Sequence, residues 1–210
     1  MTPESGGGLP MAAASSREGV ADEAQILCFL CYRETAKRDG YRGGALVTDA
    51  SGKPLEFRAT SPVRPNPVQR TLYGKTLVPH IAQELFAVAL IEALRTKPKV
   101  ILVRDETLLN VRPRVQYPIL HVRRQGEALQ APTHVERQSE AAEVVQSPSS
   151  QFQPVVITPH WQYSQEAAEV RALLQPVLAQ MDLVEPFERV DRAIEELERQ
   201  EGASDGAAVT

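Results

Sequence analysis

The chain has 210 residues, 42% of them hydrophobic and 5% aromatic, which suits one domain of ordinary size with appendages. Its opening, MTPESGGG, lacks the cationic start and apolar run of a secretory signal, and no apolar stretch reaches the roughly 20 residues that cross a bilayer. These observations predict a cytoplasmic protein with no membrane partner.

The net charge of −4 conceals a strong separation of charge along the chain. Residues 33–124 contain 17 Lys and Arg against 8 Asp and Glu, a net of +9, and the rest has 6 against 19, a net of −13. A charge separation of this size is evidence about the binding partners of the protein more than about its fold. Either the basic middle binds a polyanion such as nucleic acid, or the acidic C-terminal helices cover it and satisfy its charge within the chain.

The first elements in the chain are predicted strands. Residues 25–32, QILCFLCY, form an apolar strand, and alternation along it places Cys28 and Cys31 on opposite faces. We therefore expect two buried, inert thiols and no zinc or redox site. Residues 43–60 read as a hairpin around an Asp-Ala-Ser-Gly turn.

The next segment, PVRPNPVQRTLYGKT over residues 62–76, ends in a Gly-Lys-Thr that is typical of phosphate-binding loops. The complete pattern needs a glycine five residues before Gly74, where this chain has Gln69, so we expect no nucleotide site. Asn66 instead predicts the N-cap of a short helix that Gly74 ends, and Thr76 predicts the cap of the next helix.

The same segment supplies the candidate anion-binding residues. Arg64, Arg70 and Lys75 lie among prolines, which restrict the backbone and lower the entropy lost when cationic side chains bind a partner. For each of these residues the alternative is a solvated turn whose charge faces water.

The run HIAQELFAVALIEALRTKP, residues 80–98, predicts a helix that is apolar nearly all round and therefore buried against a sheet, with Pro98 helping to end it. Residues 99–105 predict a buried strand. Residues 117–124 predict another strand, placed near a sheet edge because of Pro118.

The remainder is predicted to be a polar linker, one short strand in PVVIT and C-terminal helices, the first interrupted at Pro176. In the last helix Phe187, Val190, Ile194 and Leu197 share one face, which favours docking on the chain's own domain or on one partner. The predicted organisation is a disordered tail (1–22), an α/β core (23–124), a linker or loop region (125–154), a helical segment (155–200) and a second disordered tail (201–210).

Residues 43–109, carried by GGALVTDASGKPLEF and AQELFAVALIEALRTKPKVILVRDETLL, resemble the ribonuclease H-like fold in their order of hairpin, helix and strand. In that family, acids of the first strand, the helix start and the next strand's end hold two divalent metals, which stabilise both oxygens of the scissile phosphodiester. The resemblance implies that Glu84 and Asp105 are the second and third acids. The first strand departs from the pattern, since it has no acid at its centre and only Glu34 near its end.

The whole chain is also similar to uncharacterised bacterial proteins with a P-V-R-P…Q-R…L-Y-G core and an EPFER ending, which implies no activity. We predict an α/β (α+β) fold with a mixed sheet of about five strands on a central buried helix. The first functional interpretation is a non-enzymatic binding domain with a basic central surface, no cofactor, and a polyanion or protein partner. The alternative is a metal-dependent nuclease, or an inactive nuclease-like domain, that uses Glu84 and Asp105.

Overall fold

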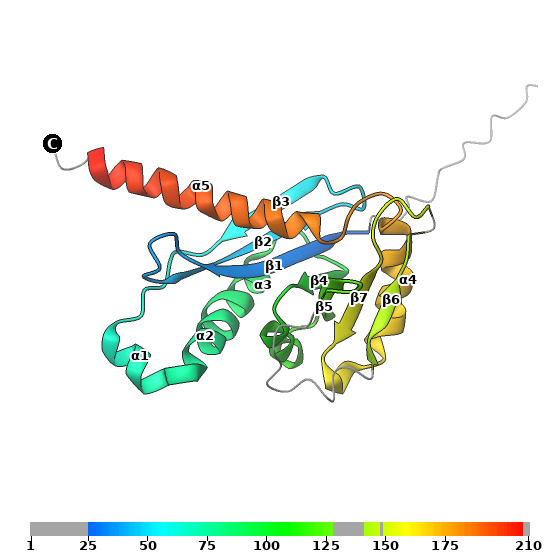
Figure 1. Ribbon diagram of the computed structural model, residues 1–210, viewed down its shortest axis with the longest axis horizontal. Coiled ribbons are helices and arrows are strands. Elements are labelled where there is room, and N and C mark those ends of the chain that lie inside the picture. The colour runs from blue at the N-terminus through cyan, green and yellow to red at the C-terminus, as the bar shows by residue number, and fades with distance from the viewer. Residues whose placement is uncertain (1–24, 128–140, 148, 208–210) are drawn as a thin grey trace, which may run out of the picture.

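The computed structural model describes residues 25–127, 141–147 and 149–207. The predicted tail over residues 1–22 and part of the predicted linker lie outside this range. The described chain forms one mixed, seven-stranded sheet with helices on both faces (Figure 1). This confirms the predicted α/β fold class and adds two strands to the five expected.

The sheet has the order β3-β2-β1-β4-β5-β7-β6. β1 pairs in parallel with β4, and β4 pairs in parallel with β5, whereas all the other neighbours are antiparallel. The strands are β1 (Leu27–Glu34), β2 (Tyr41–Thr48), β3 (Pro54–Ala59), β4 (Val100–Val103), β5 (Ile119–Arg124), β6 (Glu143–Val145) and β7 (Val155–Pro159).

The central strands are buried on both faces, as their continuous apolar runs require. Cys28 and Cys31 contribute to hydrophobic clusters on opposite faces of β1, which confirms the predicted placement. Burial raises the pKa of Cys28 to about 12, so its thiol stays protonated. The expected edge position of residues 117–124 is wrong, because β5 lies between β4 and β7. Pro118 precedes β5, and its carbonyl accepts a hydrogen bond from Ile101.

One face of the sheet is covered by a continuous helical run over residues 77–93, which we call the central helix. Ile81, Phe86 and Leu90 are almost fully buried in it, which confirms the predicted helix-on-sheet packing. The run Pro67–Ala93 is long and apolar enough to cross a membrane by composition, but a core helix of this kind passes the same test. The central helix consists of α2 (Leu77–His80), a π-helical segment (Ile81–Ala87) and α3 (Val88–Ala93).

The central helix departs from the predicted one in its middle and at its end. The amide of Val88 donates to the carbonyl of Gln83, five residues back, which is the hydrogen bond of a π-helix. The helix then ends at Leu94, whose backbone is extended, before Pro98 is reached. Glu56 of β3 accepts hydrogen bonds from the amides of Arg95 and Thr96 and so fixes the chain that leaves the helix.

The segment 62–76 precedes the central helix as α1 (Pro67–Tyr73) and a single 3₁₀ turn. Asn66 caps α1 as predicted, with its side chain accepting from the amide of Gln69 at 2.8 Å. Gly74 ends α1 with a φ of 51°, a left-handed value that glycine tolerates. Thr76 does not cap the next helix, because its hydroxyl donates to the carbonyl of Tyr73 instead.

Two helices cover the other face of the sheet, α4 (Glu166–Val177) and α5 (Glu185–Ala207). Figure 1 shows α5 lying along β1 and β2, where Phe187, Val190 and Ile194 are buried. The prediction that this helix docks on its own domain is confirmed. Pro176 does not interrupt α4, because it lies in the last turn of that helix.

Gly43 and Gly44 bring the central helix and α5 close to β2 from opposite sides. A Cβ at Gly43 would lie 2.8 Å from the Cβ of Phe86, and a Cβ at Gly44 would lie 2.7 Å from Cγ1 of Val190. Both distances are too short for two carbon atoms. The sequence Gly-Gly therefore sets the thickness of the three layers at this point.

Candidate functional site

The candidate site lies where β1 and β4 approach their carboxyl-terminal ends. In this parallel pair Leu30 is opposite Val103, so residues two positions further along each strand are Tyr32 and Asp105. Functional groups of parallel sheets gather at such carboxyl-terminal edges. The topology therefore places Asp105 just beyond the carboxyl-terminal end of β4, with Tyr32 of β1 beside it.

Neutral donors occupy both oxygens of the Asp105 carboxylate. Oδ2 accepts from the hydroxyl of Tyr32 at 2.5 Å, and Oδ1 accepts from the amide and hydroxyl of Thr107 at 2.8 and 2.7 Å. Asp105 thereby caps η3, the 3₁₀ helix over Glu106–Arg114. Burial and the hydrogen bond to Asp105 raise the pKa of Tyr32, so the phenol stays neutral.

Glu84 lies in the π-helical segment and is bound by a different partner. Its Oε2 accepts from Nη1 of Arg114 at 2.5 Å, and the side chain is 44% exposed. The neighbouring Gln83 donates to the carbonyl of Thr107 at 2.8 Å, which fastens the π-helical segment to the turn after Asp105. The two acids named from the sequence therefore belong to one region, but each is engaged separately.

The donor set does not fit a pair of divalent metals. Such a centre needs several oxygen ligands around one point, and the ribonuclease H-like resemblance implies that one of them is an acid of the first strand. The residue of β1 that binds Asp105 is Tyr32, and Glu34 is an exposed residue at the end of the strand. Across the described residues, no group of three or more His, Cys, Asp and Glu side chains could hold a metal ion.

A buried histidine, His121, lies beside this edge, although no motif in the sequence singles it out. Nε2 of His121 lies 3.1 Å from the carbonyl of Arg104, while Nδ1 has no hydrogen bond and faces a Glu106 carboxylate oxygen 3.7 Å away. Burial, followed by the Arg104 and Arg123 charges, lowers the pKa of His121 to about 4. His121 is therefore neutral at pH 7, and Nε2 donates to the carbonyl.

Two of the three predicted anion-binding residues anchor the segment 62–76 to the rest of the fold. Nε of Arg64 lies 2.8 Å from a carboxylate oxygen of Asp39, and Nη2 of Arg70 donates to the carbonyl of Asp39 at 3.0 Å. Hydrogen bonds from Thr35 and Arg64 lower the pKa of Asp39. The side chain of Lys75 is exposed and has no hydrogen bond or ion pair with any described residue.

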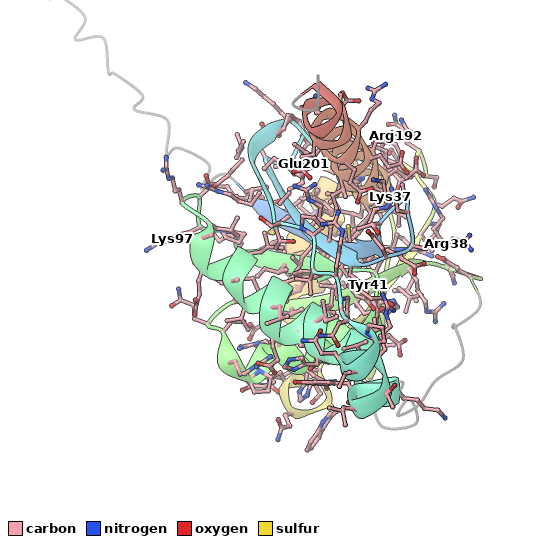
Figure 2. The ribbon with its side chains drawn as sticks, turned by 90° about the vertical axis from the view of Figure 1, so that its left-hand side faces the viewer. Lys37, Arg38, Tyr41, Lys97, Arg192 and Glu201 are labelled. Atoms are coloured by element: carbon pink, nitrogen blue, oxygen red, sulfur yellow. The ribbon has the colours of Figure 1, made fainter. Side chains whose placement is uncertain are left out.

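Acids of α5 bind two arginines of the neighbouring strands β1 and β2. Both Nη atoms of Arg42 donate to the carboxylate of Glu201, at 2.8 and 3.0 Å, and Arg33 pairs with Glu195. Figure 2 shows Glu201 on α5 above the hairpin. Of the two interpretations of the charge separation, the structure supports internal satisfaction for these arginines.

Comparison with known proteins gives a fold but no family. No protein-family model matches the chain, and no curated protein matches its sequence. Endonuclease V from Ciona intestinalis, solved with a 24mer DNA containing an inosine followed by a ribo-adenosine, has a TM-score of 0.50 and 12% identity. The match covers 85% of this chain and 88% of that one. Endonuclease V from Streptomyces avermitilis has a TM-score of 0.48 and 16% identity, over 85% and 82% of the two chains.

The similarity to the Ciona structure shows that this chain shares the fold of that Endonuclease V. It also corrects the functional interpretation. The first interpretation, a non-enzymatic binding domain with a basic central surface, is wrong, and the finding favours the alternative, which is a metal-dependent nuclease or an inactive nuclease-like domain.

Proposed function

We propose that this protein is an inactive nuclease-like domain of ribonuclease H-like fold that holds a nucleic-acid strand at the carboxyl-terminal edge of β1 and β4. The observation that carries the proposal is Tyr32, whose hydroxyl binds Asp105 from the first strand, the strand from which the ribonuclease H-like resemblance implies an acid. A neutral phenol cannot replace the charge of a bridging carboxylate. Its hydroxyl instead gives Asp105 a permanent partner.

The fold similarity supports a nucleic acid as the partner, because the Endonuclease V of Ciona was solved with DNA bound. On this chain, we propose Lys75 as a phosphate contact, since its side chain is exposed in the 3₁₀ turn that leads into the central helix. Arg64 and Arg70 take a supporting role, because their contacts with Asp39 hold the segment that presents Lys75.

Labelled single- and double-stranded DNA and RNA test both halves of the proposal. With magnesium or manganese, the wild-type protein should leave every substrate uncut while shifting at least one of them in a gel. Asp105→Asn should leave binding intact. Metal-dependent cleavage that Asp105→Asn abolishes would overturn the inactive assignment, and the lack of any shift would overturn strand binding.

Salt dependence tests the role of Lys75. Lys75→Ala should weaken binding and reduce the slope of log affinity against log salt by about 1, as expected for the loss of one phosphate contact. Lys97→Ala is the matched control, because Lys97 is also exposed but follows the other end of the central helix (Figure 2). Equal effects of the two substitutions would contradict a specific contact at Lys75.

A further inference from the structure

β3 forms one edge of the sheet, and no described strand or helix pairs with its outer side. In Figure 2 the cyan hairpin forms one side of the described fold, while α5 lies inward of it over the sheet. Leu55 and Phe57 of this strand are 46% and 37% exposed. An open edge with exposed apolar side chains is a template for pairing with another strand.

The direction of the backbone groups of β3 follows from one hydrogen bond. The amide of Thr60 donates to Gly43 of β2, and backbone groups alternate in direction along an antiparallel strand. Arg58 therefore turns its N–H and C=O toward β2, whereas Phe57 and Ala59 turn theirs outward. These outward groups are available to a further strand.

The side chains of β3 divide between the two faces of the sheet. Phe57 is opposite Leu46, whose side chain belongs to the core beneath α5. Glu56 and Arg58 point to the face of the central helix and pair with each other, Nε to Oε1, at 2.7 Å. Phe57 is therefore flanked along β3 by an acidic residue, Glu56, and a basic residue, Arg58.

We propose that β3 pairs antiparallel with β3 of a second copy of this chain, with Phe57 on the two-fold axis. In this register Phe57 exchanges both backbone hydrogen bonds with the partner's Phe57, and the two rings meet on the α5 face. Glu56 lies opposite the partner's Arg58 on the other face, and Arg58 lies opposite the partner's Glu56. The sheet then runs through both copies.

Charge complementarity selects both this occupant and this register. An axis through Glu56 would set two glutamates directly opposite each other, and an axis through Arg58 would do the same with two arginines, which is unfavourable. Only the axis through Phe57 pairs opposite charges and apolar rings together. An isologous contact of this kind closes on itself as a dimer.

The extent of pairing is limited at both ends. The register of β3 on β2 shifts between Val47 and Thr48, beside Pro54, and Pro62 has no amide to donate. We therefore expect a weak dimer whose population depends on concentration, with a dissociation constant on the order of micromolar. The other edge, β6, has three residues, and Glu143 on it pairs with Arg171 of α4.

Sedimentation velocity of the full chain from about 1 to 200 µM tests the proposal, because a micromolar dimer dissociates within this range. The mass should rise from 23.1 kDa toward twice that value. Phe57→Asp should raise the dissociation constant more than about tenfold, since it sets two carboxylates on the axis. Val144→Asp, on the opposite edge and 38% exposed, is the matched control and should have no effect.

Arg58→Glu should also weaken the dimer, because it sets the new acid opposite the partner's Glu56. Hydrogen exchange provides a measurement on the unchanged protein, in which the amides of Phe57 and Ala59 should become protected as concentration rises. A monomer at every concentration, a dimer that Val144→Asp disrupts as strongly as Phe57→Asp, or exchange at Phe57 that does not depend on concentration would each overturn the proposal.

Discussion

Two regions of this molecule place ionic and polar groups in opposite surroundings. The segment 62–76 carries Arg64, Arg70 and Lys75 on the surface of the protein. These three basic residues are easily recognised in the sequence. Around the ends of β4 and β5, by contrast, polar groups are enclosed by the core. We expect burial, more than the number of charges, to decide which of these groups stabilise the fold.

The two regions can be compared through one ion pair in each. Arg64 and Asp39 are 54% and 41% exposed, so water competes for both. Arg112 of η3 and Glu166 of α4 are 13% and 10% exposed, with Nε 3.0 Å from each carboxylate oxygen. The guanidinium of Arg112 also lies 4.1 Å above the ring of Tyr163, which completes its enclosure.

The largest expected effect comes from breaking the buried pair. Glu166→Ala leaves Arg112 charged and enclosed without its carboxylate, which should lower the free energy of unfolding by about 3–5 kcal/mol. Urea denaturation at pH 7 measures the change. Replacing both residues by Met or Leu should recover most of the loss, and a loss below about 1 kcal/mol for Glu166→Ala would show that the pair is not desolvated.

A second test of the enclosed region uses pH. His121 has its pKa lowered to about 4 in the folded protein, against about 6.5 when unfolded, so the unfolded chain binds the proton more readily. The stability that this residue contributes is present above pH 6.5 and is lost as pH falls toward 4, by about 2 kcal/mol at pH 5. Urea denaturation at pH 7 and pH 5 measures this loss, which His121→Leu should remove. A similar loss in the variant would assign the effect to other groups.

The hydrogen bond between Tyr32 and Asp105 should give a smaller effect. Tyr32→Phe removes one donor from a carboxylate that keeps its two bonds from Thr107, so we expect a loss of about 1–2 kcal/mol in thermal or urea unfolding. Tyr41→Phe is a control for the loss of a phenol on the neighbouring strand. Unchanged stability in Tyr32→Phe would mean that water replaces the hydroxyl at Asp105.

The smallest effect is expected at the surface. Arg64→Ala removes an ion pair whose acid, Asp39, is 41% exposed and keeps its hydrogen bond from Thr35 at 2.7 Å. We expect no measurable change in the midpoint of urea unfolding. A loss as large as that of Tyr32→Phe would show that the anchoring of the segment 62–76 is a major source of stability, and the comparison between the two regions would fail.

Local patterns were sufficient to predict most of the fold. Asn66 and Gly74 marked the two ends of α1 because capping depends on a few neighbouring residues. Continuous apolar runs marked β1, β4 and the central helix. The prediction that the central helix extends to Pro98 is wrong. The amides of Arg95 and Thr96, just after the helix, donate to the carboxylate of Glu56, which lies about forty residues earlier in the chain.

The candidate site was less predictable, since its contacts join distant parts of the chain. Asp105 was named from the resemblance, but its partner Tyr32 lies 73 residues away and has no motif around it. Arg112 and Glu166 are 54 residues apart. The pairing of Arg42 with Glu201 depends on α5 crossing β2, which no local pattern of charge can indicate.

The adjacent glycines of β2 have a mechanical consequence. Because Gly43 contacts the central helix and Gly44 contacts α5, the backbone alone separates two helices that belong to different hydrophobic cores. If α5 moves toward the sheet at this point, neither Gly43 nor Gly44 has a side chain that could change its rotamer to make room. The backbone of β2 would then press on Phe86 of the central helix. The two sides of the molecule should therefore respond as one body to a load on either helix.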